Sequence, residues 1–316
     1  MKAQLNPSPE DLTLLTLASR FDTEDKARAY LEAIQWPDGP ICPHCGNAKE
    51  GRIWRLAANP AKKIRPGLLR CADCKKQFTV TVGTIFEDSH IPLSKWLTAW
   101  YLLNASKKGI SALQIQRMLK IGSYRTALFM MHRIRFALKD LSPPPTKLKG
   151  TVEVDETYVG GKVHGSYGPR AGGKVPVFAM VERDGKARSQ VVNCVTGNNL
   201  KRILHENVDT SATIMTDDFR PYRKATKEFE GHETVNHSAK EYVRGNVHTN
   251  TVEGYFSLLK RGIVGTFHSV SKQHLPLYLA EFDHRYNTRT QTDGERTVEG
   301  LGKVQGKRLM YRKPAA

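Results

Sequence analysis

The chain has 316 residues, about the length of two domains, and 39% of them are hydrophobic. This composition can fill a core in each domain, which argues against an intrinsically disordered chain, a collagen-like repeat or a small disulfide scaffold. Lys and Arg number 49 against 31 Asp and Glu, and the net charge of +18 favours a polyanionic partner such as nucleic acid. No apolar run approaches the roughly 18 residues of a membrane-spanning helix. Residues 12–18 are predicted to form an amphipathic helix within an N-terminal helical segment, residues 1–40, and not a secretion signal.

Four of the five cysteines form two Cys-x-x-Cys pairs, Cys42 with Cys45 and Cys71 with Cys74, separated by 25 residues. Each pair places two thiolates on one tight turn, and two facing turns complete a tetrahedral metal site. The sequence therefore predicts a structural Zn²⁺ held by these four residues in a zinc ribbon over residues 41–91. Two redox-active pairs are the alternative, although such pairs usually occur singly beside a βαβ pattern. Free thiols and a metal site indicate a reducing, cytoplasmic compartment.

A helical pattern follows over residues 92–141. The apolar stripe of its first helix repeats at i, i+3, i+4 and i+7, as Trp96, Ala99, Trp100 and Leu103. Ser111 and Ser123 are predicted to cap two further helices on either side of a turn that contains glycine. Two such helices are typical of a helix-turn-helix domain, whose second helix enters the major groove of DNA. An ordinary helical bundle is the alternative.

The charge of this part of the chain supports DNA binding. Between Ile41 and Asp140 there are 18 basic and five acidic residues, which account for +13 of the net +18. We therefore expect the main nucleic-acid contact here, although a solvated lysine-rich surface is the alternative. The candidates for contact on the third predicted helix are Tyr124, Arg125, His132, Arg133 and Arg135.

A proline-rich linker, residues 142–149, is predicted to precede a catalytic domain over residues 150–290, and a basic C-terminal tail, residues 291–316, to follow it. The domain alternates between strand and helix periods, which is typical of a mixed α/β fold. Strands are predicted at 151–155, 175–181, 189–195, 212–215 and 232–235, and helices at 199–207, 251–261 and 274–285. The dipeptide Asp184-Gly185 predicts a hairpin, and Cys194 is predicted to be a small buried hydrophobe.

Asp155 and Asp217 come at the ends of two predicted strands. Carboxylates on rigid, adjacent elements can hold two Mg²⁺ ions about 3.5 to 4 Å apart, an arrangement that cleaves phosphodiester bonds. Glu253, at the start of a predicted helix, is a candidate for a third acid, and Lys260 and Arg261 share its helical face as candidates for phosphate binding. Taken singly, an Asp in such a position is more often a strand-end or cap residue, and only the combination points to catalysis.

Four segments carry a resemblance to a known family. They are VEVDETYVGGK at 152–162, TDDFRPY at 216–222, VNHS at 235–238 and HTNTVEGYFSLLKRG at 248–262. In this order, behind a zinc ribbon, they resemble the ISXO2-like transposases of insertion sequences, over nearly the whole chain from the ribbon to about residue 289. The resemblance implies an α/β fold, with a ribonuclease-H-like mixed-sheet catalytic domain of the DDE type preceded by a zinc ribbon and a helix-turn-helix domain.

The resemblance also implies the roles of individual residues. Asp155 and Asp217 would be the first two catalytic acids, Glu253 the third, and Lys260 would complete an E-x6-K helix. Members of this group can use Asn as the third residue, so Asn250, one turn before Glu253, is the alternative third ligand. Glu253 is preferred because its spacing fits the common layout and because a carboxylate binds a second Mg²⁺ better than an amide does.

The motifs also contain acidic and histidine side chains beside the three candidate catalytic acids. On a strand, adjacent side chains face opposite ways, so only one of Asp155 and Glu156, and one of Asp217 and Asp218, is expected to reach the metals. Two histidines of the motifs, His237 and His248, either orient ligands and phosphates or have a structural role.

Together these features predict an enzyme that binds the terminal inverted repeats of its element as double-stranded DNA. It would cleave phosphodiester bonds with Mg²⁺, or Mn²⁺, to expose 3′-hydroxyls, and join these to target DNA. The resemblance implies paired DNA ends, hence a homo-oligomer on DNA near the nucleoid of a prokaryote, without a membrane partner. A DNA-binding regulator with an inactive domain and a ribonuclease-H-like nuclease without strand transfer are the alternatives.

Overall fold

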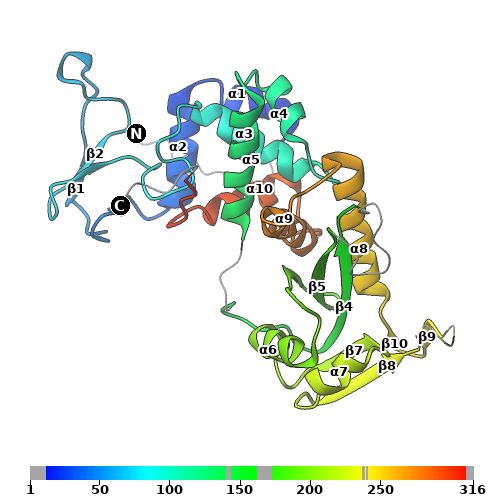
Figure 1. The fold of residues 1–316 in the computed structure, drawn as a ribbon. Helices are drawn as coiled ribbons and strands as arrows, with labels where there is room; N and C mark the ends of the chain where they lie inside the picture. The colour runs from blue at the N-terminus through cyan, green and yellow to red at the C-terminus, as the bar shows by residue number, and fades with distance from the viewer. Residues whose placement is uncertain (1–11, 140–143, 162–172, 237–238, 240, 311–316) are drawn as a thin grey trace. The chain divides into compact units, whose positions relative to one another are not determined.

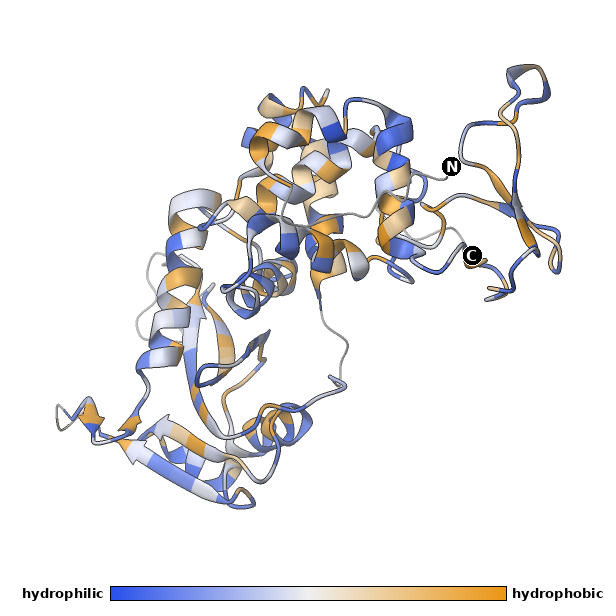
Figure 2. Ribbon diagram, turned by 180° about the vertical axis from the view of Figure 1, so that it is seen from behind, coloured by the Kyte–Doolittle hydropathy of each residue, from blue (hydrophilic) through white to orange (hydrophobic). Residues whose placement is uncertain are grey.

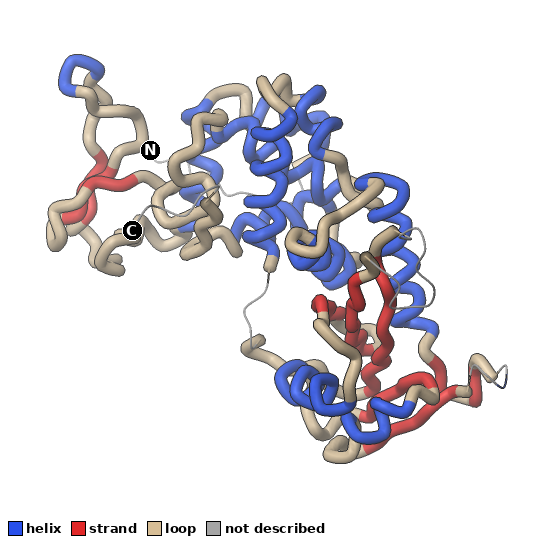
Figure 3. Tube along the Cα trace, in the orientation of Figure 1, coloured by secondary structure: helices blue, strands red, loops and turns tan. Residues whose placement is uncertain are grey.

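The computed structural model describes residues 12–139, 144–161, 173–236, 239 and 241–310. The chain divides into two compact units, the first made of residues 1–138 with 290–316 and the second of residues 139–289. Helices dominate the first unit and a five-stranded sheet the second (Figures 1 and 3). Residues 142 and 143 of the predicted linker, residues 311–316 of the predicted tail and the motif residues Lys162, His237 and Ser238 lie outside the described residues. Among the helices that the structure describes, none has the length and apolar character needed to cross a membrane.

The first unit is built on a helical core. Its helices are α1 Leu14–Arg20, α2 Glu24–Gln35, α3 Leu93–Ala105, α4 Ala112–Met118, α5 Tyr124–Leu138 and α10 Asp293–Gly302. The predicted stripe of α3 is buried, as Trp96, Ala99, Trp100 and Leu103. Apolar residues alternate with polar ones along the helices of both units (Figure 2), as expected for amphipathic helices around a core.

Both predicted N-caps of the helix-turn-helix region are confirmed. The Ser111 hydroxyl accepts a hydrogen bond from the backbone N–H of Gln114, at 3.1 Å, and begins α4. The Ser123 hydroxyl does the same for Thr126, also at 3.1 Å, at the start of α5. These bonds satisfy donors that have no partner within a helix, and they fix where the two helices begin.

A small three-stranded antiparallel sheet forms the ribbon. Its strands are β1 Ile53–Arg55, β2 Leu69–Cys71 and β3 Gln77–Phe78, with β2 in the middle. Phe78 and Leu69 fill its core against the buried thiols of Cys42 and Cys71. This apolar core is small, so a bound metal would contribute much of the ribbon's stability.

The C-terminal segment differs from the expected tail, because it contains helix α10. The buried side chains of Leu301 and Val304 join the core of the first unit, and the Gln35 side-chain amide donates to the Leu301 carbonyl at 2.5 Å. Helix α10 also has a capping box, in which Thr292 and Glu295 bond each other's backbone N–H groups. The polar residues of this segment suggested a tail, but its few apolar residues lie on one helical face.

The second unit contains a mixed five-stranded sheet in the order β6-β5-β4-β7-β8. Its strands are β4 Thr151–Val159, β5 Val175–Glu182, β6 Ala187–Val191, β7 Thr213–Asp217 and β8 Gly231–Val235. Strands β4, β5 and β6 are antiparallel, whereas β7 and β8 run parallel to β4. This arrangement confirms the expected mixed α/β class and is the ribonuclease-H-like sheet that the resemblance implies.

Helices cover both faces of this sheet. Even-numbered residues of β4, such as Val152, pack with α6 Gly197–Asn207 and α7 Arg220–Ala225. The opposite face packs against α8 Asn250–Gly262 and α9 Leu275–Asn287, which are joined through a π-helical turn, Ile263–Phe267. A short hairpin of β9 Val243–Arg244 and β10 Val247–His248 leads into α8. Each residue of β4 therefore faces either α6 and α7 or α8 and α9.

The β5–β6 region confirms one prediction and corrects another. Asp184 adopts a positive φ of 57° in the predicted hairpin turn between the two strands. Strand β6 ends at Val191, however, and Cys194 is exposed, so its predicted burial is wrong. The apolar run 191–195 suggested a longer strand, but only Val192 and Val195 of the residues after Val191 turn into the core.

Candidate active site

Four sulfur atoms converge in the ribbon. The Sγ atoms of Cys42, Cys45, Cys71 and Cys74 all lie within 4.8 Å of one another. Backbone hydrogen bonding from Cys74 is the largest influence that lowers the pKa of the Cys71 thiol, to about 6, and the Asn47 side chain adds to it. Since zinc binds thiolates in tetrahedral geometry, these residues fit a structural Zn²⁺.

The first two acids lie where two parallel strands separate. Strands β4 and β7 pair in register up to Glu153 opposite Met215. Two residues further along each strand come Asp155 and Asp217. Asp217 ends β7 as predicted, but the prediction that Asp155 ends its strand is wrong, because β4 continues to pair with β5 up to Val159.

The pleat of β4 separates the neighbouring acids Asp155 and Glu156. Asp155 pairs with Ala179, a residue of the core beneath α8 and α9, so Asp155 faces that side of the sheet. Glu156 pairs with Phe178 on the other side, where its carboxylate accepts a hydrogen bond from the Tyr222 hydroxyl of α7. Asp155 and Glu156 therefore lie on opposite faces of the sheet. In the second pair of neighbouring acids, Asp217 is the last residue of β7 and Asp218 is exposed just after it.

Glu253 approaches from the first turn of α8. Its Oε1 accepts a hydrogen bond of 3.1 Å from the buried hydroxyl of Thr249, the residue that precedes the helix. Its negative charge is close enough to Asp155 to raise the pKa of that group. An acid from the helix therefore acts electrostatically on an acid from the sheet.

The electrostatics of Asp155 show that several negative charges meet around it. Burial is the largest cause that raises its pKa to about 8, and the charges of Glu156, Asp217 and Glu253 add to the rise. Burial also raises the pKa of Glu156, with a further contribution from Asp217. Carboxyl groups whose pKa is shifted by both burial and neighbouring charges are typical of functional sites.

The acids are spaced more widely than the cysteines. In the part of the chain that the structure describes, the four cysteines are the one group of three or more metal-binding side chains whose ligand atoms lie within 4.8 Å of one another. A closed site for a single ion would need such convergence. Two ions about 3.5 to 4 Å apart would instead spread their ligands over a longer distance.

The remaining candidates on α8 are exposed. Asn250 is the first residue of the helix, and Lys260 and Arg261 lie near its end. Lys260 comes seven positions after Glu253, which places it on almost the same face of the helix and about 10 Å further along the axis. The Arg261 Nε donates to the Ser257 carbonyl at 3.2 Å. These cations are therefore placed for contacts beyond the acids.

The candidates for DNA contact on α5 divide into two groups. Tyr124 and Arg125 are exposed at the start of the helix, in the position expected of a recognition helix. His132, Arg133 and Arg135 are buried, so the expectation that they form a contact surface is not supported. The Arg133 guanidinium donates to the Glu87 carbonyl at 2.6 Å and lies over the Trp96 ring at 5.6 Å from its centroid.

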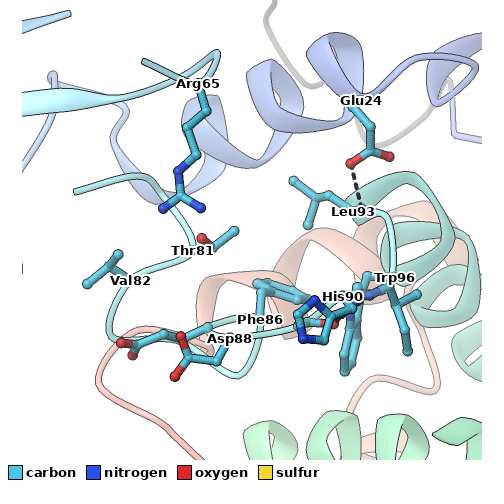
Figure 4. A pocket seen from close by; sticks show the side chains of 12 residues that line it. Glu24, Arg65, Thr81, Val82, Phe86, Asp88, His90, Leu93 and Trp96 are labelled. Atoms are coloured by element: carbon cyan, nitrogen blue, oxygen red, sulfur yellow. Dashed lines mark hydrogen bonds between the residues drawn. The ribbon is translucent and has the colours of Figure 1, made fainter. Parts of the chain in front are cut away.

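A cavity of about 380 Å³ lies in the first unit, and its lining is drawn in Figure 4. Its polar residues already serve the fold. The Glu24 carboxylate accepts hydrogen bonds from the backbone N–H groups of Leu93, at 2.7 Å, and Ser94, at 3.0 Å, at the start of α3. Asp88 is ion-paired with Arg308. The acidic residues Glu24 and Asp88 at this cavity are therefore engaged in contacts within the first unit.

The structure adds one acid that sequence reasoning missed. Glu153 is fully buried on the same face of β4 as Asp155, and its carboxylate binds the backbone at the start of α8. The available signal was its position two residues before Asp155, because residues i and i+2 of a strand share a face.

Comparison with known proteins finds two matching domain families and two related proteins. Residues 147–287 match the ISXO2-like transposase domain, and residues 22–77 match the transposase zinc-ribbon domain. A protein described as uncharacterized in the transposable element ISH50 of Halobacterium salinarum is 30% identical over 285 residues, which are 84% of this chain and 91% of the relative. An uncharacterized transposase-like protein of Haemophilus influenzae is 28% identical over 102 residues, 32% of this chain and 81% of that protein.

Proposed function

Because this chain belongs to the ISXO2-like family of insertion-sequence transposases, we propose that it recombines the DNA of its own element. It binds the terminal inverted repeats, cleaves phosphodiester bonds to expose 3′-hydroxyls, and transfers these ends to target DNA. The observation that carries the proposal is the placement of three acids: Asp155 and Asp217 each lie two residues beyond the last paired position of two adjacent parallel strands, and Glu253 lies in the first turn of α8. The charges of Asp217 and Glu253 both raise the pKa of Asp155.

We assign Asp155, Asp217 and Glu253 as ligands of two Mg²⁺ ions, which Mn²⁺ can replace. The donor set fits, because all three residues offer the hard oxygen ligands that these ions prefer. When bound, the ions activate the attacking water or hydroxyl and stabilise the charge on the leaving oxygen. Asn250 remains the alternative third ligand, and the charge that Glu253 exerts on Asp155 favours Glu253.

The side chains of the chain itself hold and orient the reacting groups. Asp155 must lose its proton to act as a ligand, and its raised pKa makes this loss depend on pH. The Thr249 hydroxyl orients the Glu253 carboxylate. Lys260 and Arg261 would bind phosphates next to the scissile one, about 10 Å along the helix. Positioning and neutralisation of charge carry most of the rate in such phosphoryl transfers.

DNA binding is assigned mainly to the first unit. Its helix-turn-helix region presents Tyr124 and Arg125 at the exposed start of α5. The zinc ribbon, with its zinc held by the four cysteines, would contribute further contacts from a strongly basic part of the chain. Because phosphate contacts release counterions, binding should weaken steeply as salt rises.

The test is cleavage of DNA duplexes that carry the inverted repeats flanking the coding sequence. With Mg²⁺, the wild-type protein should nick at the element end, and Asp155→Asn and Asp217→Asn should bind the duplex without cleaving it. Glu253→Gln and Asn250→Ala, compared side by side, identify the third ligand. Full cleavage by Asp155→Asn would contradict the assignment.

A joining assay separates transposition from simple nuclease action. A pre-cleaved end with a free 3′-hydroxyl should be joined to target DNA by the wild-type protein. Cleavage without joining would indicate a nuclease, and binding without either reaction would indicate a regulator with an inactive domain.

Pairing of two DNA ends requires more than one copy of the protein, so we propose a homo-oligomer on DNA. The molar mass of the complex with end duplexes, measured by light scattering, should correspond to at least two chains.

A further inference from the structure

From the contacts of Glu153 we propose that this buried acid positions the third catalytic acid without binding metal itself. The inference rests on the proposed function, since it concerns how Glu253 is held beside Asp155. Glu153 lies on β4 and is 0% exposed. In general, an isolated buried carboxylate is costly, and it persists only with hydrogen-bonding or charged partners.

The carboxylate of Glu153 binds the first turn of α8. Its Oε2 accepts hydrogen bonds from the backbone N–H of Thr251, at 2.7 Å, and of Val252, at 3.1 Å. Its Oε1 accepts one from the Thr251 hydroxyl, at 2.8 Å. Within the described part of the chain, the side chain of the N-cap residue Thr249 makes no capping bond to these amides, so Glu153 takes over the capping of the helix. A negative charge at a helix N-terminus is also favoured by the helix dipole.

The same carboxylate is neutralised by a cation from the β5–β6 turn. Arg183 Nε donates to Glu153 Oε1 at 2.7 Å, and the other nitrogens of this guanidinium donate to the carbonyls of Asn246, at 2.8 Å, and His248, at 3.0 Å. His248 Nδ1 lies 3.1 Å from Glu153 Oε1. Arg183 therefore ties the hairpin that precedes α8 to the same point on β4.

These contacts occupy the whole carboxylate. A carboxylate has about four lone-pair positions, and Glu153 already accepts four hydrogen bonds, from Arg183, Val252 and the amide and hydroxyl of Thr251. Its oxygen positions are therefore all taken before a metal ion could bind, although it is close to Asp155 along the strand.

The geometry links the two catalytic elements through one strand. Asp155 follows Glu153 by two residues on the same face, about 7 Å away along β4. Glu253 follows Val252, one of the two residues whose amides Glu153 holds. Strand β4 thus provides the first acid directly and fixes the third acid through Glu153, so their spacing is set by a single element.

The experiment compares the full-length protein with Glu153→Gln. Binding of Mn²⁺ to the protein without DNA is measured by electron paramagnetic resonance, together with the Mg²⁺ concentration that gives half-maximal cleavage. The variant should bind end duplexes normally, while its Mn²⁺ affinity falls and its Mg²⁺ requirement rises by about 10-fold or more, as for residues that orient metal ligands. Exchange of the Thr251 and Val252 amides with solvent should accelerate.

The matched control is Glu281→Gln. Glu281 is also fully buried in the second unit, and it is ion-paired with Arg285 on α9 at 2.7 Å. Its replacement should reduce stability but leave Mn²⁺ affinity within about twofold of wild type, because its ion pair lies within α9 and not at the start of α8. Equal effects of the two variants on metal binding would show that Glu153 acts only through stability, and would overturn the proposal.

If Glu153→Gln does not fold, Thr251→Val decides the question. This variant keeps the backbone amides but loses the hydroxyl bond to Glu153. A smaller rise in the Mg²⁺ requirement, about 2- to 5-fold, is expected for one lost hydrogen bond. Unchanged metal affinity with faster amide exchange at α8 would overturn the proposal. If the wild-type protein itself neither cleaves nor binds Mn²⁺ at Asp155, the proposed function has failed instead.

Discussion

Replacement of Asp155 by Asn should stabilise the metal-free protein at alkaline pH. The raised pKa means that the folded protein binds this proton more tightly than the unfolded chain, whose Asp has a pKa near 3.8. The resulting stability is fully present below about pH 4 and is lost as the pH rises to about 8. The side-chain amide of the Asp155→Asn variant carries no charge, so the substitution should remove this dependence.

The size of the effect follows from the pKa shift. Each pKa unit corresponds to about 1.4 kcal/mol, so a rise from 3.8 to about 8 sets an upper limit of about 6 kcal/mol above pH 8. We expect roughly half of this limit, because buried sites respond to charge with an effective dielectric constant nearer 20 than 4. A gain in stability on replacing Asp155 would agree with its proposed catalytic role, because function and stability often conflict at active sites.

The assay must report on the second unit. All four tryptophans of the chain, at positions 36, 54, 96 and 100, belong to the first unit, so tryptophan fluorescence does not follow the sheet. Exchange of the β4 amides, measured by mass spectrometry between pH 5 and 9 in a chelator, reports the local opening free energy. Addition of Mg²⁺ should then slow exchange in the wild type and not in Asp155→Asn, since binding to the folded state stabilises it.

Asp209→Asn is the control. Backbone hydrogen bonding from Ser211 lowers the pKa of Asp209, so the charged form of this residue stabilises the folded protein, in contrast to Asp155. This variant should not gain stability at pH 8, and its response to Mg²⁺ should equal that of wild type. The reasoning is refuted if Asp155→Asn is no more stable than wild type at pH 8 in the chelator.

Three further outcomes are expected. Replacement of Cys42 or Cys71 by Ser should unfold the ribbon and release zinc, and unchanged zinc content by atomic absorption would contradict the assignment. Arg125→Ala should weaken binding to any duplex and reduce the slope of log affinity against log salt by about 1. Arg133→Ala should mainly lower stability, because Arg133 is buried. Equal salt slopes for the two variants would argue against the conclusion that Arg125 contacts DNA and Arg133 does not. Leu301→Ala should destabilise the first unit by about 2 to 5 kcal/mol in tryptophan-monitored denaturation, and a negligible change would mean that α10 contributes little to the core.

Local signals in the sequence predicted much of the fold. The caps Ser111 and Ser123 and the buried stripe of α3 are confirmed. In the second unit the five strands of the sheet and helices α6, α8 and α9 lie in the predicted order, whereas α7 and the hairpin of β9 and β10 were not predicted. Each depends on a short-range rule, either a side-chain oxygen before a helix or a hydrophobic period of 3.6 or 2. Such rules need no knowledge of what the element packs against.

The sequence failed where a residue's environment is set by distant parts of the chain. Arg133 is a basic residue on the predicted recognition helix, which suggested a DNA contact. Its guanidinium is instead buried, where it contacts the Glu87 carbonyl and the Trp96 ring. In the sequence, Glu153 resembles any polar residue of a strand. Its capping contact with the start of α8 is visible only in the folded structure. Helix α10 was overlooked because its core partners lie more than 150 residues earlier. Burial and pairing of this kind are tertiary properties, which local patterns do not encode.

The return of α10 to the first unit has a consequence for biosynthesis. The ribosome makes helices α1 to α5, then the whole sheet unit, and only then the segment that completes the first hydrophobic core. Until α10 emerges, the surface that Leu301 and Val304 later cover stays exposed on the nascent chain. A chain truncated after α9 would therefore contain the whole sheet of the second unit but would lack the segment that completes the hydrophobic core of the first unit.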